Sequence, residues 1–322
     1  MNAQASGSGI AARSHGVQVS LTELIALRGE SRRLKLAPRG KVLATRNGGH
    51  LSRFRGRGME FDESRIYVPG DDPRNMDWKV TARSGKPHVK LFREERERPV
   101  WLFVDLGPSM RFGTRTAFKS VAAARAAALL AWAATERGDR VGGLVFDETR
   151  SYDQVPAPRT RGVLPLLNAL AQPPRTDTGT GHAGVTRAAT HLTRLVRPGS
   201  LVFLISDFLD VYKDPAVWLA RLTEHSEVVL IHVVDPVEMA APPAGRYPVS
   251  DGARRALFDT TRAALRGAYA QRFADQVQWL ERVAIQNRAH RLQLRTDAAT
   301  GEVLAGGLNP RANGMPAQGA RT

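Results

Sequence analysis

The sequence predicts an α/β protein whose core is a doubly wound, mostly parallel sheet, with a small β-rich subdomain at the N-terminal end. Three observations lead to this fold class. From residue 100 onward, short apolar runs alternate with longer stretches of helical periodicity. These apolar runs are continuous, which is typical of strands that are buried on both faces of a parallel sheet. The first 98 residues lack the alternation and are rich in glycine, arginine and turn residues.

The alternation predicts core strands and helices in sequence order. Each predicted strand is followed by a loop, and in sheets of this type ligands bind beyond the carboxyl ends of the strands. A short hairpin or irregular segment is expected around Tyr247–Val249. The expected strands are 100–104, 140–146, 201–206, 227–234 and 290–294, and the expected helices are 116–137, 161–172, 182–196, 215–225 and 259–286.

The remaining segments divide the chain. Residues 1–18 are predicted to be a disordered N-terminus and residues 298–322 a flexible C-terminal tail, because both are rich in small and polar residues. Residues 19–98 are expected to form an Arg-rich β or irregular subdomain that includes a short helix near its start. Residues 99–297 are expected to form the α/β domain.

The amino-acid composition limits the classes of protein to which this chain can belong. The 322 residues contain 42% apolar side chains, enough for a sizeable core. There is no cysteine, so disulfides and thiolate sites are excluded, and a reducing cytoplasmic location is expected. The longest apolar stretch, Ala126–Ala134, is far shorter than the roughly 20 residues that cross a bilayer, so we expect no membrane span.

Oxygen-bearing side chains lie in loops at the expected ends of strands. Asp105 and Ser109 follow the strand 100–104, Asp207 follows the strand 201–206, and Thr178 or Thr180 precedes a helix. Such oxygens suit Mg²⁺ or Mn²⁺. The structural alternative is that Asp105 caps a turn, Asp207 caps a helix and the threonines lie in a solvated loop.

A second candidate region is the segment 65–78, which reads RIYVPGDDPRNMDW. Its carboxylates are interleaved with arginines, a density that suits an internal lattice of ion pairs. The functional alternative is that part of the lattice faces a partner protein. The candidate partner-binding residues are Arg65, Tyr67, Asp71, Asp72, Arg74, Asp77, Trp78 and Arg83.

The sequence lacks the motifs of several classes of enzyme. The chain has no GxxxxGK[ST] sequence, and the formal GxGxxG match at 179–184 does not directly follow a buried strand, so no nucleotide cofactor is expected. The eight histidines have no metal-binding spacing, and Ser109 is not in a GxSxG turn. We therefore expect no catalytic residues and a protein that is not an enzyme.

The segment 65–97 closely resembles the domain of unknown function 58 family. The similarity rests on RxYxPGDDPRxxDW, on TAR and on VKxFREEREx followed directly by an apolar strand and its Asp-containing loop; GDRVG at 138–142 and SDF at 206–208 also fit. It covers roughly residues 53–210 and extends more weakly to residue 297. The resemblance implies a von Willebrand factor A-like fold and a partnership with a MoxR-type AAA+ ATPase in the maturation of protein complexes.

The resemblance also implies a degenerate metal-ion-dependent adhesion site. A complete site of that fold uses Asp-x-Ser-x-Ser, a threonine and a later aspartate, and a partner's carboxylate completes the coordination. Asp105, Ser109 and Asp207 match these positions, whereas Gly107 replaces the first serine. The threonine would be Thr178 or Thr180. A site with Mg²⁺ or Mn²⁺ and a site without metal both remain open.

These observations favour a non-enzymatic adaptor or scaffold that binds a MoxR-type AAA+ ATPase, its client protein, or both. The alternative is a nucleic-acid-binding protein, because the net charge is +16 and the first 98 residues are the more basic part. Acidic residues interrupt that basic segment. A metal-dependent phosphohydrolase using Asp105 and Asp207 would lack a base and a phosphate cradle. The basic segment contains Arg53, Phe54, Arg55 and Arg57, interrupted by Asp62, Glu63, Asp71 and Asp72.

Overall fold

A computed structural model describes residues 16–34, 36, 59–94, 97–173, 184–212, 216–250 and 255–308. The chain forms two compact units. One is Val42–Glu97, and the other combines Met1–Lys41 with Arg98–Thr322. Among the described residues, no helix combines the length and the apolar character that a membrane crossing requires.

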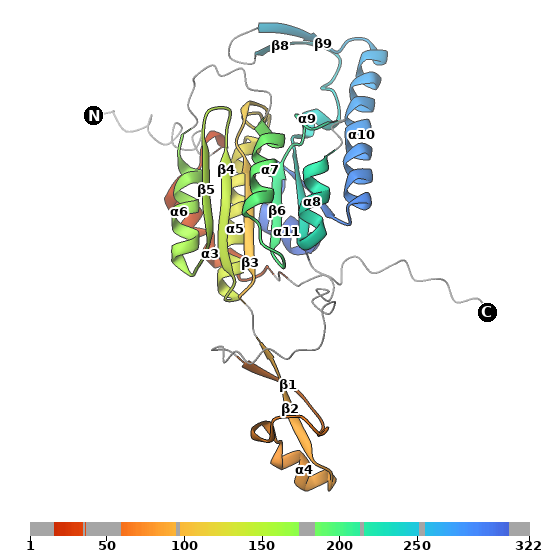
Figure 1. The fold of residues 1–322 in the computed structure, drawn as a ribbon. Coiled ribbons are helices and arrows are strands. Elements are labelled where there is room, and N and C mark those ends of the chain that lie inside the picture. Colours follow the sequence, from red (N-terminus) through yellow and green to blue (C-terminus); the bar gives the residue numbers. More distant parts are fainter. Residues whose placement is uncertain are drawn as a thin grey trace, which may run out of the picture. The chain divides into compact units, whose positions relative to one another are not determined.

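The larger unit is built on a six-stranded sheet with the order β10-β7-β6-β3-β4-β5 (Figure 1). Neighbouring strands from β10 to β4 run parallel, and β5 pairs antiparallel with β4. The predicted mostly parallel α/β sheet is therefore confirmed, whereas the edge strand β5 was not predicted. The strands are β3 (Pro99–Asp105), β4 (Arg140–Phe146), β5 (Ser151–Pro158), β6 (Leu201–Ser206), β7 (Glu227–Val234) and β10 (His290–Arg295).

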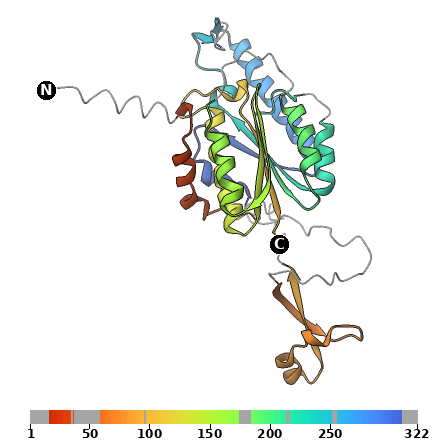
Figure 2. The same cartoon turned by 60° about the vertical axis from the view of Figure 1, so that its left-hand side comes forward.

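Helices cover both faces of this sheet, as Figure 2 shows. Successive side chains of a strand point to opposite faces, and in β3 residues 100, 102 and 104 join one core whereas 101 and 103 join the other. The first core receives α2 (Leu21–Ala26), α5 (Lys119–Glu136), α6 (Thr160–Ala171) and α11 (Thr300–Leu308). The second receives α7 (Gly184–Leu195), α8 (Val217–His225) and α10 (Ala263–Gln286).

The ends of the larger unit differ from the expected division of the chain. The short helices α2 and α3 (Arg28–Ser31) contact α5 in the α/β unit, although we expected residues 19–98 to form a separate subdomain. The reason is packing: Leu24 is fully buried, and the Trp132 indole Nε1 donates to its carbonyl over 3.0 Å. Similarly, α11 buries Leu304 within the segment expected to be a flexible tail.

Shorter elements complete the larger unit. The 3₁₀ turn η2 (Pro108–Met110) follows β3, and α9 (Pro236–Met239) follows β7. The strands β8 (Arg246–Ser250) and β9 (Arg255–Asp259) pair antiparallel, so the long helix begins at Ala263 and not near residue 259 as expected. Residues 1–15 of the predicted disordered N-terminus and residues 309–322 of the predicted tail lie outside the described residues.

The smaller unit contains an antiparallel pair, β1 (Met59–Ile66) and β2 (His88–Glu94). The connection between the two strands carries the 3₁₀ turn η1 (Pro73–Asn75) and the helix α4 (Trp78–Ser84). Asp72 and Asp77 accept hydrogen bonds from backbone N–H groups at the starts of η1 and α4. These caps explain the positions of two of the three carboxylates of the 65–78 segment.

Candidate functional site

Two neighbouring parallel strands, β3 and β6, end side by side at the carboxyl edge of the larger sheet. Asp105 ends β3, and Ser206 ends β6 immediately before Asp207. The Ser206 hydroxyl donates to Asp105 Oδ2 over 2.6 Å, and the Gly107 N–H donates to Asp105 Oδ1 over 2.8 Å. The structure thus brings the two predicted aspartates to one edge of the sheet, and both are buried.

A buried lysine that the sequence did not mark as a site residue also lies at this edge. Lys119 is the first residue of α5, and its Nζ lies 2.7 Å from Asp207 Oδ2 and 2.5 Å from Glu238 Oε1. Glu238 belongs to α9, which follows β7. A sequence signal did exist, because a cation at a helix N-terminus faces the positive end of the helix dipole. A lysine in that position, before an apolar helix, indicates a nearby anion.

Burial and charge shift the proton equilibria of the edge. Burial, followed by the negative charge of Asp207, raises the pKa of Asp105 from 3.8 to about 7. Burial by itself would lower the pKa of Lys119, but the carboxylates of Asp207 and Glu238 outweigh it and hold this pKa above its ordinary value. Burial also raises the pKa of Glu238. The ammonium is therefore protonated at neutral pH.

The carboxylate oxygens at this edge already accept hydrogen bonds from within the fold. Both oxygens of Asp105 accept hydrogen bonds, and Asp207 accepts from the Leu209 N–H with Oδ1 and from Lys119 with Oδ2. Nowhere in the described part of the chain do three or more carboxylate or imidazole side chains form a group that could hold a metal ion. A bound ion would share these carboxylates with donors that the fold already supplies.

The other predicted ligands are distributed differently. Ser109 lies in η2 directly after β3 and is half-buried. At Gly107, a Cβ atom would lie 3.0 Å from Asp105 Oδ1, so a serine there would press against the carboxylate. Thr178 and Thr180 lie outside the described residues, as do Gly179 and Gly181 of the formal glycine motif.

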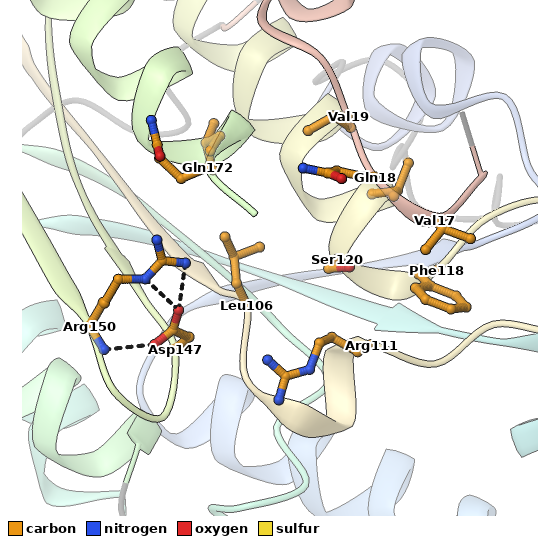
Figure 3. A pocket seen from close by; sticks show the side chains of 12 residues that line it. Val17, Gln18, Val19, Leu106, Arg111, Phe118, Ser120, Asp147, Arg150 and Gln172 are labelled. Atoms are coloured by element: carbon orange, nitrogen blue, oxygen red, sulfur yellow. Dashed lines mark hydrogen bonds and ion pairs between the residues drawn. The ribbon is translucent and has the colours of Figure 1, made fainter. Parts of the chain in front are cut away.

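A mostly apolar pocket of about 170 Å³ lies at the same edge, between the ends of β3 and β4 and the start of α5 (Figure 3). Arg111 pairs with Glu148 beside it, and Arg150 Nε donates to Asp147 Oδ2 over 2.9 Å. Arg111 Nη1 and Glu148 Oε2 are buried without a hydrogen-bond partner among the described residues. The pocket is lined by Val17, Gln18, Val19, Leu106, Arg111, Phe118, Ser120, Val121, Asp147, Arg150, Leu170 and Gln172.

In the smaller unit, two of the predicted partner-binding carboxylates accept hydrogen bonds from within the unit. Asp71 accepts from Arg65 over 2.7 Å and from the Val68 N–H over 3.0 Å. Asp77 accepts from the Ser64 hydroxyl over 2.6 Å and from the Val80 N–H.

The other predicted partner-binding residues of the smaller unit differ in exposure. Tyr67 is half-buried, whereas Arg74 and Arg83 are exposed and the Trp78 side chain is 70% exposed. Trp78 therefore offers the largest free apolar surface of the set. The residues on which the nucleic-acid alternative rests, the basic Arg53, Arg55 and Arg57 and the aromatic Phe54, lie outside the described residues.

Comparisons with known proteins give one family and several relatives. The model of the family described as "Protein of unknown function DUF58" matches residues 63–278. Uncharacterized proteins of Mycobacterium bovis and Mycobacterium tuberculosis are 34% identical over 224 residues, which cover 68% of this chain and 69% of each relative. Among solved structures, the conserved hypothetical protein BatB of Bacteroides thetaiotaomicron is 15% identical, with a TM-score of 0.40, over 66% of this chain and 97% of that one. An aerotolerance-related membrane protein of Bacteroides fragilis is 13% identical, with a TM-score of 0.40, over 65% and 96% of the two chains.

Proposed function

This chain belongs to the family described as Protein of unknown function DUF58, and from that starting point we propose that it is a protein-binding adaptor or scaffold and not an enzyme. Its proposed partner is a MoxR-type AAA+ ATPase, the client protein of that ATPase, or both, during the maturation of protein complexes. The proposal includes a von Willebrand factor A-like fold for the α/β unit. It places the protein in the cytoplasm, which suits a chain without cysteine.

The observation that carries the proposal is the state of the carboxylates at the strand ends. All four oxygens of Asp105 and Asp207 accept hydrogen bonds from within the fold. A general base or a nucleophile has to be within reach of a substrate, whereas both of these carboxylates are buried. These carboxylates instead fix the loops around them, as expected of a recognition surface.

The pocket beside these loops supports binding of a protein group. Its wall is mostly apolar, with Leu106 and Phe118 among the lining residues. Arg111, which pairs with Glu148, adds a charged side chain to the lining. Apolar pockets with a few polar groups at their margin are typical of the places where partners insert an anchoring side chain.

Co-purification from the native host tests the proposal. Tagged wild type, Leu106→Asp and the matched control Leu265→Asp would be purified in parallel, with thermal melts to confirm folding, and bound proteins identified by mass spectrometry. Leu265 is 51% exposed in α10 and does not line the pocket. A third variant, Trp78→Ala, tests the smaller unit.

The expected result is an AAA+ ATPase that accompanies wild type and Leu265→Asp and is depleted with Leu106→Asp. Loss with Trp78→Ala alone would move the interface to the smaller unit while keeping the adaptor function. Recovery of nucleic acid, with no AAA+ ATPase or common client in any sample, would contradict the proposal. A nuclease-treated sample separates direct protein contacts from those bridged by nucleic acid.

A further inference from the structure

We propose that the Lys119 ammonium is a built-in cation at the strand-end edge, where it takes the part that a divalent ion would otherwise play in holding Asp207 and Glu238 together. This inference concerns how the edge is assembled and does not depend on the identity of any partner. It departs from the magnesium or manganese site that is one of the two alternatives left open by the loop sequence. Its basis is the set of contacts around one side chain.

The ammonium has directed partners and no access to solvent. Lys119 is 0% exposed, and its Nζ contacts Asp207 at 2.7 Å and Glu238 at 2.5 Å. The Phe112 ring centroid lies 5.9 Å from the same Nζ, within the range of a cation–π contact. A buried charge is tolerated only when it is paired and hydrogen-bonded, and this one satisfies both conditions.

Lys119 joins three parts of the sheet edge. It starts the helix after β3, while Asp207 follows β6 and Glu238 follows β7. The Lys119 N–H also donates to the Phe112 carbonyl over 2.8 Å, which closes the loop between β3 and α5. One cation thus ties together loops that come from three strands, which is the structural part that a metal ion plays in a shared site.

Glu238 is itself held from the other side. Its Oε2 accepts from the Asp235 N–H over 2.8 Å, and the Asp235 side chain accepts from Thr114 and Thr296. Thr296 follows β10, so the network continues to the far strand of the sheet. The carboxylate facing the ammonium is therefore fixed in place before any ligand arrives.

A divalent ion would compete with this arrangement. It would have to bind Asp207, whose two oxygens already accept from Lys119 and from the Leu209 N–H. The ion and the ammonium would then share one carboxylate, and two positive charges that close repel strongly in a poorly solvated interior. Removing the ammonium removes that repulsion and leaves the carboxylates of Asp207 and Glu238, its former partners, as two oxygen donors, to which water molecules can add the remaining ligands of Mn²⁺.

The experiment compares wild type, Lys119→Met and the matched control Lys79→Met, in which an exposed lysine of α4 is changed. Mn²⁺ binding is followed by the loss of the free-ion signal in electron paramagnetic resonance, and by thermal melts with Mn²⁺ or with EDTA. We expect no Mn²⁺ binding and no change of melting temperature for wild type and Lys79→Met. Lys119→Met should bind Mn²⁺, and its melting temperature should rise with Mn²⁺ concentration by mass action.

Melting with added Mn²⁺ remains informative if Lys119→Met is less stable than wild type, because the ion should restore part of the lost stability. The gain should disappear in Lys119→Met/Asp207→Asn. The proposal would be overturned if wild type bound Mn²⁺ and lost it on Asp207→Asn. It would equally be overturned if Lys119→Met gained no affinity, because the ammonium would then not stand in for an ion.

Discussion

The Ser206 hydroxyl and the Asp105 carboxylate, 2.6 Å apart, join the ends of β6 and β3 inside the protein. Ser206 also accepts from the Phe208 N–H over 3.0 Å, so one hydroxyl connects the end of β3 with the loop that follows β6. Both side chains are buried, and water cannot easily replace the bond. The geometry of the strand-end edge depends on this pair, and its removal has a measurable cost.

Ser206→Ala should lower the free energy of unfolding by about 1–3 kcal/mol, because it leaves a buried carboxylate oxygen and a backbone N–H without their partner. Urea unfolding at neutral pH measures this change. Ser151→Ala, at an exposed position of β5, is the matched control and should change stability by less than about 0.5 kcal/mol. Equal small effects of both substitutions would show that the Ser206 bond contributes little.

The stability of Asp105→Asn relative to wild type should rise as pH rises. In wild type, burial and the charge of Asp207 raise the pKa of Asp105 to about 7 in the folded state, above its ordinary value of 3.8. The folded state therefore holds a proton that the unfolded state releases, and wild type loses stability from about pH 4 to pH 7, by up to about 4 kcal/mol. Asparagine cannot titrate. The difference in unfolding free energy, variant minus wild type, should rise across this window, and a flat difference would contradict the account.

The stability of His232→Phe relative to wild type should rise as pH falls, opposite to Asp105→Asn. His232 is buried beside Phe273 and Phe208, and burial, followed by the charge of Arg291, lowers its pKa from 6.5 to about 3. Below pH 6.5 the unfolded chain takes up a proton that the folded chain does not, so wild type loses about 1.4 kcal/mol per pH unit from this group.

Phenylalanine removes that loss. The variant should therefore gain on wild type as pH falls from 6.5 toward 3, measured by denaturant unfolding at a series of pH values. A constant difference would mean that the folded protein accommodates a charged His232.

Gly162→Ala should destabilise the larger unit by about 2 kcal/mol or more. A Cβ atom at Gly162 in α6 would overlap the carbonyl oxygens of Ala157 and Val141, so the helix would have to move away from β4 and β5. Gly267→Ala is the matched helical control, because a Cβ atom there meets nothing within 4 Å. That substitution in α10 should stabilise by roughly 0.5–1 kcal/mol through helix propensity. Thermal unfolding of the two variants should shift in opposite directions.

The sequence predicted the centre of the fold better than its margins. Strands β3, β4, β6 and β7 are visible as apolar runs because the sheet buries both of their faces, whereas the edge strand β10 is mostly half-buried. The edge strand β5 contains two prolines and is mostly exposed, so no apolar run marks it. The helix α11 is short and glycine-containing, and it forms where its apolar face can pack against the core.

The candidate site was predicted only in part. Asp105 and Asp207 could be placed at one edge because parallel strands end together. Lys119 and Glu238 could not be paired from sequence, since they are separated by 119 positions and meet only through the order of the strands. The same holds for Leu24 and Trp132, whose contact assigns α2 to the larger unit. Long-range side-chain pairs of this kind leave no periodic signal.

Photocrosslinking in the native host tests the adaptor proposal most directly. A benzophenone amino acid would replace Gln172, an exposed residue lining the pocket, and in a control would replace Leu265 in α10. The account predicts that irradiation of the Gln172 protein yields a covalent product containing an AAA+ ATPase or its client protein, and that the Leu265 control yields much less. Crosslinks to nucleic acid alone, or equal protein products from both positions, would contradict a partner-binding role for this edge of the sheet.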